Sequence, residues 1–310
     1  MIDAAARTTP AGDSTAGDFA TFGPVHLDVT DGARALGFWR DLVGLAPLPD
    51  AGDGIRLGAG GRPLVVLHPG ATAPTPRNAS GLYHLALHLP TLAEFARVVG
   101  RLAAAGHPHY PTDHLMHYAD YADDPDGNGL ELAFETPERL GSARVGPNGP
   151  ELTDAAGRPH SGRAPIDLPW LFSHVPDGDT RPGLPAGTIV GHVHLRVADV
   201  DEALAFYRDA VGFTTNMYMP RLGAFDTSAG GSFPHRLAAN VWESAGRPQR
   251  PAGAAGMRRF TLVLRSADDL ELVAARVAAA GGTVEHRGNG VLVADPSGNR
   301  LLLTAAPSGA

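Results

Sequence analysis

Three segments of the sequence alternate apolar residues with His or Glu, which is the pattern of a β-strand with one packed face. The segments are residues 83–89, 129–135 and 191–197. In each segment the Leu, Val or Phe residues fall on one face, which suits packing beneath a helix. The opposite face carries, segment by segment, His84 and His88, Glu131 and Glu135, and His192 and His194. If the sheet curls, these polar side chains point into one cleft.

Two histidines and one carboxylate can form the facial triad of a non-haem Fe(II) site, which leaves three coordination positions open. Each residue taken alone is better explained as a hydrogen-bonded polar side chain on a half-exposed strand. Their occurrence at equivalent positions of three similar strands favours the metal site. The chain has no cysteine, so thiolate metal sites, disulfides and a catalytic thiol are excluded. Any metal must be held by His, Asp or Glu.

The chain also repeats itself. Three pairs of segments match at nearly constant offset: 26–29 with 194–197, 38–45 with 206–213, and 124–129 with 295–300. A near-constant offset over three segments indicates a duplicated module.

Each module divides into two similar halves. In the first half, a strand at 25–29 is followed by a helix at 33–43, which Gly44 ends. In the second half, the strand at 83–89 is followed by a helix at 92–105 and then by short strands. The order βαβββ therefore occurs four times, which predicts an α+β fold. The expected organisation is a disordered tail (1–20), a first module (21–137), a connector rich in Gly and Pro (138–187) and a second module (188–306).

The composition is that of a soluble globular protein, with 310 residues, 43% apolar residues and a formal net charge of −8. The acidic balance argues against nucleic acid or an anionic membrane as a partner, because both reward a basic face. No run approaches the roughly 18 apolar residues of a membrane helix, and residues 1–20 lack the pattern of a signal peptide. The expected location is the cytoplasm.

These residues resemble the vicinal oxygen chelate superfamily, which includes glyoxalases, extradiol dioxygenases and bleomycin-resistance proteins. More closely, the chain is similar to the two-module catechol 2,3-dioxygenase family. The matching segments are 81–86, 113–114, 124–131, 191–195 and 240–242. The resemblance covers roughly residues 22–305. It implies four βαβββ half-modules that form two vicinal oxygen chelate modules with curled mixed sheets.

The resemblance implies that the metal ligands are His84, Glu131 and His192, drawn from the second and third half-modules. His194 points to the same face as His192 and remains its rival. Register favours His192, because His194 is matched in the first module by His26.

The equivalent positions of the other two half-modules are occupied by Pro24, Arg259 and Leu302. Pro and Leu cannot ligate through their side chains, and Arg is cationic. The sequence therefore predicts one metal per chain and a vestigial second cleft.

The resemblance also implies that His114 and Tyr121 manage protons and developing charge, with His235 as a weaker candidate. For His117 and Tyr118, surface or pocket wall is the favoured interpretation. Two pocket stretches depart from the family: residues 115–121 lack a run of Ser-Glu-Ala-Leu-Tyr, and residues 234–236 lack a run of three histidines. The substrate is therefore left open among catechols, hydroquinones and related phenols.

The expected function is an Fe(II)-dependent extradiol dioxygenase, with Mn(II) as the alternative metal and O₂ and a small aromatic molecule as substrates. A homodimer is a further expectation. One alternative is a glyoxalase-like lyase or isomerase that uses Ni, Zn or Mn. That chemistry commonly recruits a fourth ligand, a Glu, where this chain has Arg236. The other alternative is a non-catalytic protein that binds aromatic drugs, but such proteins typically lack the three ligands.

Overall fold

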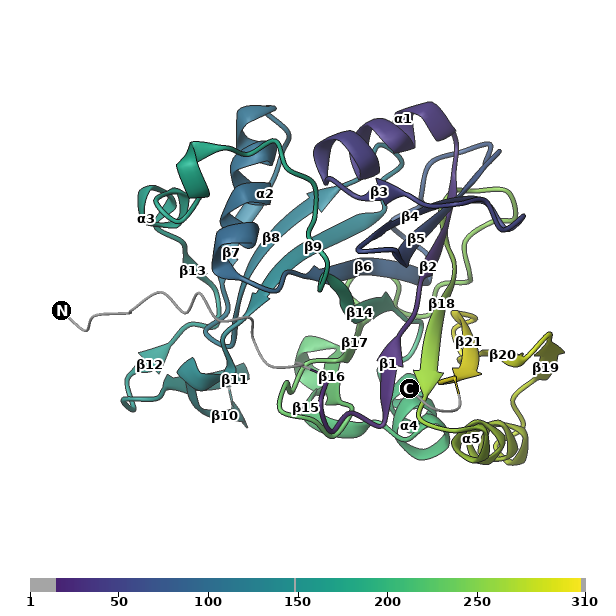
Figure 1. Cartoon of the computed structure of the whole chain (residues 1–310). Helices are drawn as coiled ribbons and strands as arrows, with labels where there is room; N and C mark the ends of the chain where they lie inside the picture. The colour runs from purple at the N-terminus through teal and green to yellow at the C-terminus, as the bar shows by residue number, and fades with distance from the viewer. Residues whose placement is uncertain (1–14, 148, 308–310) are drawn as a thin grey trace.

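The structure of the chain is a computed structural model that describes residues 15–147 and 149–307. It has the expected α+β architecture, with two nine-stranded mixed sheets, a separate three-stranded sheet and helices packed on the large sheets (Figure 1). One continuous cluster of buried apolar side chains runs through both large sheets and their helices. Among the described residues, no helix is long and apolar enough to cross a membrane.

The first large sheet joins the first and fourth halves of the repeat. Its two halves meet at the antiparallel pair β2 (Val25–Val29) and β18 (Gly256–Leu264). The remaining strands of this sheet are β1 (Ala20–Phe22), β3 (Ala46–Pro47), β4 (Ile55–Ala59), β5 (Arg62–Pro69), β19 (Val284–Arg287), β20 (Gly290–Ala294) and β21 (Arg300–Ala305).

The second large sheet joins the second and third halves. Here the two halves meet at the antiparallel pair β6 (Gly81–His88) and β14 (Ile189–Arg196). The remaining strands are β7 (Tyr110–Asp113), β8 (His117–Asp123), β9 (Gly129–Glu135), β13 (Ala164–Pro165), β15 (Thr214–Met219), β16 (Ala224–Ser228) and β17 (Leu237–Asn240). This is the pairing of half-modules that the predicted ligand set requires.

The repeated segments 38–45 and 206–213 form the same structure in both modules. α1 (Gly32–Leu36) widens into the π-helical turn η1 (Gly37–Leu42), and α4 (Val200–Ala205) widens into η4 (Phe206–Val211). Gly44 follows the first of these with φ 95°, and Gly212 ends the second with φ 114°. Glycine adopts this left-handed conformation without steric cost, which confirms Gly44 as the residue that ends the helix.

The other helices begin at capping side chains. Thr91 accepts a backbone hydrogen bond at the start of α2 (Leu92–Ala104), and Ser266 does so at the start of α5 (Ala267–Ala279). In Figure 1, α2 covers the β6–β9 side of the second large sheet, and α5 lies beside β20 and β21. The short helices are α3 (Leu168–Phe172), η2 (Pro137–Arg139), η3 (Pro176–Gly178) and η5 (Pro220–Leu222).

Two repeated motifs contact each other across each module. The indole of Trp39 donates a hydrogen bond to Asp124 (Nε1 to Oδ2, 3.2 Å), and the Tyr207 hydroxyl donates one to Asp295 (3.0 Å). All four side chains are buried. The aromatic residue of each π-helical turn is therefore tied to the turn that precedes the last strand of its module.

The segment between the modules carries more structure than its composition predicts. Here β10 (Leu140–Gly146), β11 (Gly149–Asp154) and β12 (Pro159–His160) form the three-stranded sheet. β13 then adds to the edge of the second large sheet by pairing with β7. The connector is thus part of the sheet that holds the candidate site.

The predicted disordered tail falls partly outside the described residues, which begin at residue 15. Residues 15–20 differ from the expectation, because they lie against the fold. Asp18 is buried and bonded to Arg236, and Ala20 pairs with Leu264 in the first large sheet.

The contact between Tyr207 and Asp295 can be tested with Tyr207→Phe. The variant should lower the free energy of unfolding by about 1–3 kcal/mol, because a buried hydrogen bond to a carboxyl group is lost. Urea denaturation followed by circular dichroism measures the change. Tyr218→Phe is the matched control: Tyr218 is partly exposed, its hydroxyl bonds Asp201 at the surface, and no measurable change is expected. Equal stability of Tyr207→Phe and the parent protein would contradict this role for the repeated motif.

Candidate metal centre

The three predicted ligands lie on adjacent strands in the middle of the second large sheet. Glu131 on β9 and His192 on β14 are both paired with Ala86 on β6, one from each side. His84 lies two residues before Ala86 on the same face of β6. Because the fully buried Ala86 side chain is small, the three larger side chains can converge over it.

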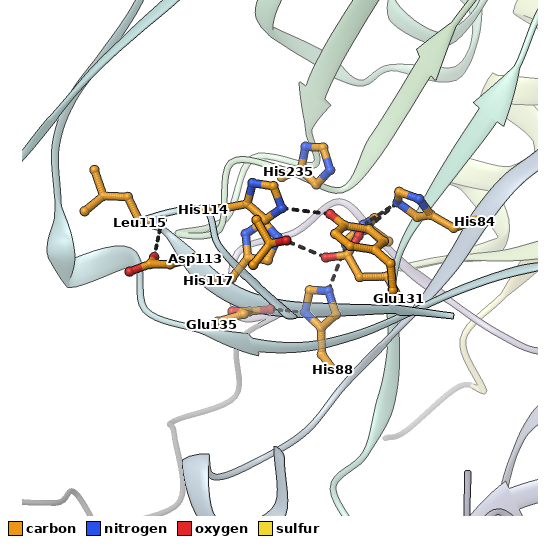
Figure 2. Close-up of polar contacts among 12 residues, drawn as sticks. His84, His88, Asp113, His114, Leu115, His117, Glu131, Glu135 and His235 are labelled. Atoms are coloured by element: carbon orange, nitrogen blue, oxygen red, sulfur yellow. Dashed lines mark hydrogen bonds and ion pairs between the residues drawn. The ribbon is translucent and has the colours of Figure 1, made fainter. Parts of the chain in front are cut away.

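Their donor atoms are close together. Glu131 Oε2 lies 3.0 Å from His84 Nε2 and 3.2 Å from His192 Nε2, and the two Nε2 atoms are 3.3 Å apart. All three side chains are buried. Figure 2 shows His84 and Glu131 facing each other within this network. His194, the rival of His192, does not belong to this group.

The spacing and chemistry of these donors fit a first-row divalent metal ion. Two donors about 2.1 Å from an ion and at right angles to each other are about 3 Å apart, close to the separations found here. Burial alone would raise the pKa of Glu131, but His192, His117 and His84 surround the carboxylate and hold its pKa well below the usual range. Two imidazoles and one carboxylate are therefore available as ligands.

His192 is oriented by a relay of hydrogen bonds behind it. Its Nδ1 lies 2.8 Å from His88 Nε2, and His88 Nδ1 lies 2.6 Å from Glu135 Oε1. Glu135 is a carboxylate, since His88 and Arg236 lower its pKa against the effect of burial. A carboxylate only accepts, so His88 donates from Nδ1, and its Nε2 must accept from His192 Nδ1. The lone pair of His192 Nε2 is then directed toward Glu131 and His84.

The position of His88 explains why residue 191 is a glycine, which the sequence pattern did not indicate. A β-carbon added to Gly191 would lie 2.1 Å from the His88 ring, so only glycine allows the ring to lie there. The pairing of β14 with β6 is irregular at this residue, between Val190 and His192.

Arg236 extends the relay to the N-terminal segment. Its Nη1 donates to Glu135 Oε1 (3.0 Å), and its Nε donates to Asp18 Oδ2 (2.8 Å). Arg236 is 1% exposed, so its charge is compensated inside the protein rather than by water. Arg236 occupies the position at which a glyoxalase-like enzyme would have a fourth ligand. In this chain it donates a hydrogen bond to Glu135 instead.

Glu131 has a second partner in His117. His117 Nε2 lies 2.9 Å from Glu131 Oε1, the oxygen that does not face His84 and His192. Its ring is stacked between those of His114 and His235, at centroid distances of 4.8 and 6.1 Å. His117 was predicted to be surface or pocket wall; it is buried and lines the cleft. The alternation of β8 alone could not show that it touches Glu131.

His114 and Tyr121 form a hydrogen-bonded pair beside the three ligands. His114 Nδ1 lies 2.6 Å from the carbonyl oxygen of Gly162, so this nitrogen donates. His114 Nε2, 2.9 Å from the Tyr121 hydroxyl, is then the acceptor. Burial is the main reason why the pKa of His114 falls to about 3, and burial together with Glu131 raises the pKa of Tyr121. Both groups are therefore neutral at pH 7.

His235 and His194 also line the cleft. Nδ1 of His235 is 3.1 Å from Asp226 Oδ1. Burial lowers the pKa of His235, but Asp226 and Glu131 outweigh it, so that the pKa is raised. His194 Nε2 accepts a hydrogen bond from the Asn240 amide (2.9 Å), which leaves this nitrogen without a free lone pair.

A cleft of about 930 Å³ opens beside the three ligands. His84, His114, His117, Tyr121 and His235 line it, together with aromatic and sulfur-containing side chains from both modules. The connector supplies part of the wall through Pro150, Leu152 and residues 161–163. Apolar side chains make up most of the wall, and histidines, arginines and aspartates supply its polar groups.

A sequence model of the Glyoxalase/Bleomycin resistance protein/Dioxygenase superfamily matches residues 21–132 and 189–303. The chain belongs to this superfamily. Its curated relative catechol-2,3-dioxygenase of Bacillus subtilis (strain 168) is 31% identical over 277 residues, covering 88% of this chain and 93% of the relative.

Two solved structures of the superfamily fold are similar along most of the chain. Glyoxalase I from Zea mays superposes with a TM-score of 0.55 at 16% identity and covers 95% of each chain. A dioxygenase candidate from Bacillus subtilis superposes with a TM-score of 0.58 at 14% identity, covering 93% of this chain and 86% of the other. At sequence identities of 16% and 14%, these two similarities show a shared fold.

The two large sheets differ in the polar side chains at the contact between their half-modules. In the first large sheet, Arg259 pairs with His26 across β18 and β2, and its Nη2 lies 3.2 Å from His26 Nε2. His26 Nδ1 lies 2.9 Å from His68 Nε2, and burial together with Arg259 lowers the pKa of His26 to about 3. Within residues 15–147 and 149–307, only His84, Glu131 and His192 converge as a set of three metal-binding side chains.

The relay from Glu135 predicts the tautomers of two histidines in metal-free protein. His88 and His192 should both carry the proton on Nδ1, which long-range ¹H–¹⁵N spectra of the imidazoles detect. Glu135→Gln should allow both tautomers of His88 and His192, because an amide can also donate to His88. Asp123→Asn, at the exposed rim, is the control and should leave both tautomers unchanged. An Nε2-protonated His192 in the parent protein would contradict the relay.

Proposed function

We propose that this chain is an Fe(II)-dependent, extradiol-type ring-cleaving dioxygenase that acts with O₂ on a catechol, hydroquinone or related phenol. The observation that carries the proposal is the buried cluster of His84, Glu131 and His192 beside a cleft with a neutral His–Tyr pair in its wall. The Bacillus subtilis relative, named a catechol-2,3-dioxygenase, supports the same activity.

His84, Glu131 and His192 would hold the metal ion. When bound, Fe(II) lowers the pKa of a coordinated phenol and brings the ring and O₂ together. The protein contributes orientation: Glu131 is fixed by His117, and His192 is fixed by His88. Because all these groups are buried, water does not compete for their hydrogen bonds.

Tyr121 and His114 provide a route for a substrate proton. Tyr121 donates to His114 Nε2, so its own oxygen can accept a proton from a substrate hydroxyl while its proton passes to that nitrogen. His114 then carries both protons, with Nδ1 still bonded to the carbonyl oxygen of Gly162. His235, with its raised pKa, is a second group in the cleft that can donate a proton.

The ligand assignment predicts that His84→Ala and Glu131→Ala lose iron while the fold survives. Each removes one of three donors, and neither side chain belongs to the apolar core. Metal analysis of anaerobically purified protein, circular dichroism and O₂ uptake with catechols, hydroquinones and aminophenols measure the three properties. The parent protein should hold one iron per chain.

His194→Ala is the matched control for this prediction. It removes a buried histidine from the same face of β14, but it should keep iron because His194 lies outside the ligand group. Iron retention in His84→Ala and Glu131→Ala, or two tightly bound metals per chain, would overturn the assignment. Isomerase activity with Ni(II) or Zn(II), without O₂ uptake, would favour a glyoxalase-like enzyme.

The proton route predicts that His114→Ala and Tyr121→Phe keep iron but lose turnover. The loss should be roughly 10²-fold or more, which is the usual effect of removing a positioned acid or base. Steady-state O₂ uptake at saturating substrate measures it, and iron analysis of the same samples excludes metal loss as the cause. His286→Ala, an exposed histidine on β19, should turn over normally. Full turnover in His114→Ala would show that the route lies elsewhere.

A further inference from the structure

One end of the cleft is lined by three arginines. Arg77, Arg163 and Arg196 come from three separate parts of the chain, and all three line the cleft around Tyr83. The protein as a whole is acidic, with a formal net charge of −8, so this local excess of cations is unlike the composition of the chain.

Two of these arginines already have carboxylate partners. Arg77 Nη2 lies 2.7 Å from Asp123 Oδ2, and Arg196 Nη1 lies 3.2 Å from Glu243 Oε2. Among the described residues, the guanidinium of Arg163 has no ion-pair or hydrogen-bond partner. The arginine end of the cleft therefore has one positive charge more than its own carboxylates neutralise.

The backbone fixes Arg163 next to the candidate site. The residue before it, Gly162, accepts the hydrogen bond from His114. The residue after it, Ala164, pairs with Asp113 in the strand contact between β13 and β7. Arg163 is thus held between two contacts to the segment that carries His114, and its exposed side chain reaches the cleft without being buried in the wall.

The surrounding side chains suit an aromatic ring with a charged substituent. Tyr83 lies edge-on to Trp242 at a centroid distance of 5.4 Å, and both rings line the cleft. Tyr83 also lies 5.4 Å from the ring of His84, one of the three candidate ligands. Arg163 lines the same cleft as Tyr121 and His194.

Arg196 is buried in the wall of the same end. It is 4% exposed, and its two terminal guanidinium nitrogens are bonded to Glu243 and to the carbonyl oxygen of Leu82. Its donors are therefore used within the protein, and Arg163 is the arginine of this end whose guanidinium is exposed and unpaired among the described residues.

We propose that the substrate carries an anionic ring substituent, a carboxylate, which Arg163 binds at the arginine end of the cleft. This inference rests on the proposed function, because it describes the ring that would be cleaved at the neighbouring metal centre. Arg163 provides a planar pair of donors suited to a carboxylate. A neutral catechol leaves the charge of Arg163 without an anionic partner.

The test compares acidic and neutral ring diols on the iron-loaded protein. Substrates are 3,4-dihydroxybenzoate, 3,4-dihydroxyphenylacetate and unsubstituted catechol, and O₂ uptake gives kcat/KM for each. At least one acid should exceed catechol. Arg163→Gln should lower kcat/KM for that acid about 10- to 100-fold, the effect of losing a charge-assisted hydrogen bond, and leave catechol unchanged. Arg163→Lys should recover part of the loss, because it keeps the charge but not the paired donors.

Binding without turnover provides an independent measurement. Calorimetry on anaerobic iron-loaded protein should show that Arg163→Gln weakens binding of the acid by the same factor and leaves catechol binding unchanged. Arg62→Gln, an exposed arginine on β5 in the other large sheet, is the control and should match the parent protein.

The outcomes separate this inference from the proposed function. Equal kcat/KM for acids and catechol, unaffected by Arg163→Gln, would overturn the carboxylate site and leave ring cleavage standing. Absence of O₂ uptake with these diols and with the hydroquinones and aminophenols tested above, together with Arg163-dependent binding of the acid, would overturn the dioxygenase and support the carboxylate site.

Discussion

The candidate site depends on the antiparallel pairing of β6 with β14, because this contact joins two modules that are far apart in the sequence. It places His192 on one side of Ala86, while the parallel pairing of β6 with β9 places Glu131 on the other. The side-chain period of a strand is two, so a slip of one residue would turn every ligand away from the cleft. Packing of the apolar face therefore also fixes the register of the polar face.

A buried carboxylate without hydrogen-bond partners would destabilise the fold, and both oxygens of Glu131 have neighbouring imidazoles. One oxygen faces His84 and His192, and the other faces His117. The charge behind His192 is compensated in turn, since Glu135 is held by Arg236. The polar residues of the sheet thus form one connected network, and such networks hold their members in defined orientations.

Sequence periodicity could predict which residues share a face but not which of them touch. The alternation placed His88 and Glu135 on the same face as the ligands, and the structure joins them in the relay behind His192. Nothing in the local pattern could show that Arg236 completes this relay or that Gly191 makes room for it. The connector was predicted only as a linker, because its contribution to the cleft depends on tertiary contacts between distant strands.

The first large sheet shows how far the fold depends on the candidate metal ligands. It keeps the antiparallel contact between half-modules, with β2 paired to β18, although Arg259 and His26 face each other where the second sheet has His84 and His194. Each module also keeps its buried bond between an aromatic residue and an aspartate, Trp39 with Asp124 and Tyr207 with Asp295. The same type of sheet therefore forms with different polar side chains at its centre. The apolar faces and the bonds between an aromatic residue and an aspartate are common to both sheets. The fold is held by what the modules share, and the chemistry resides in the side chains by which they differ.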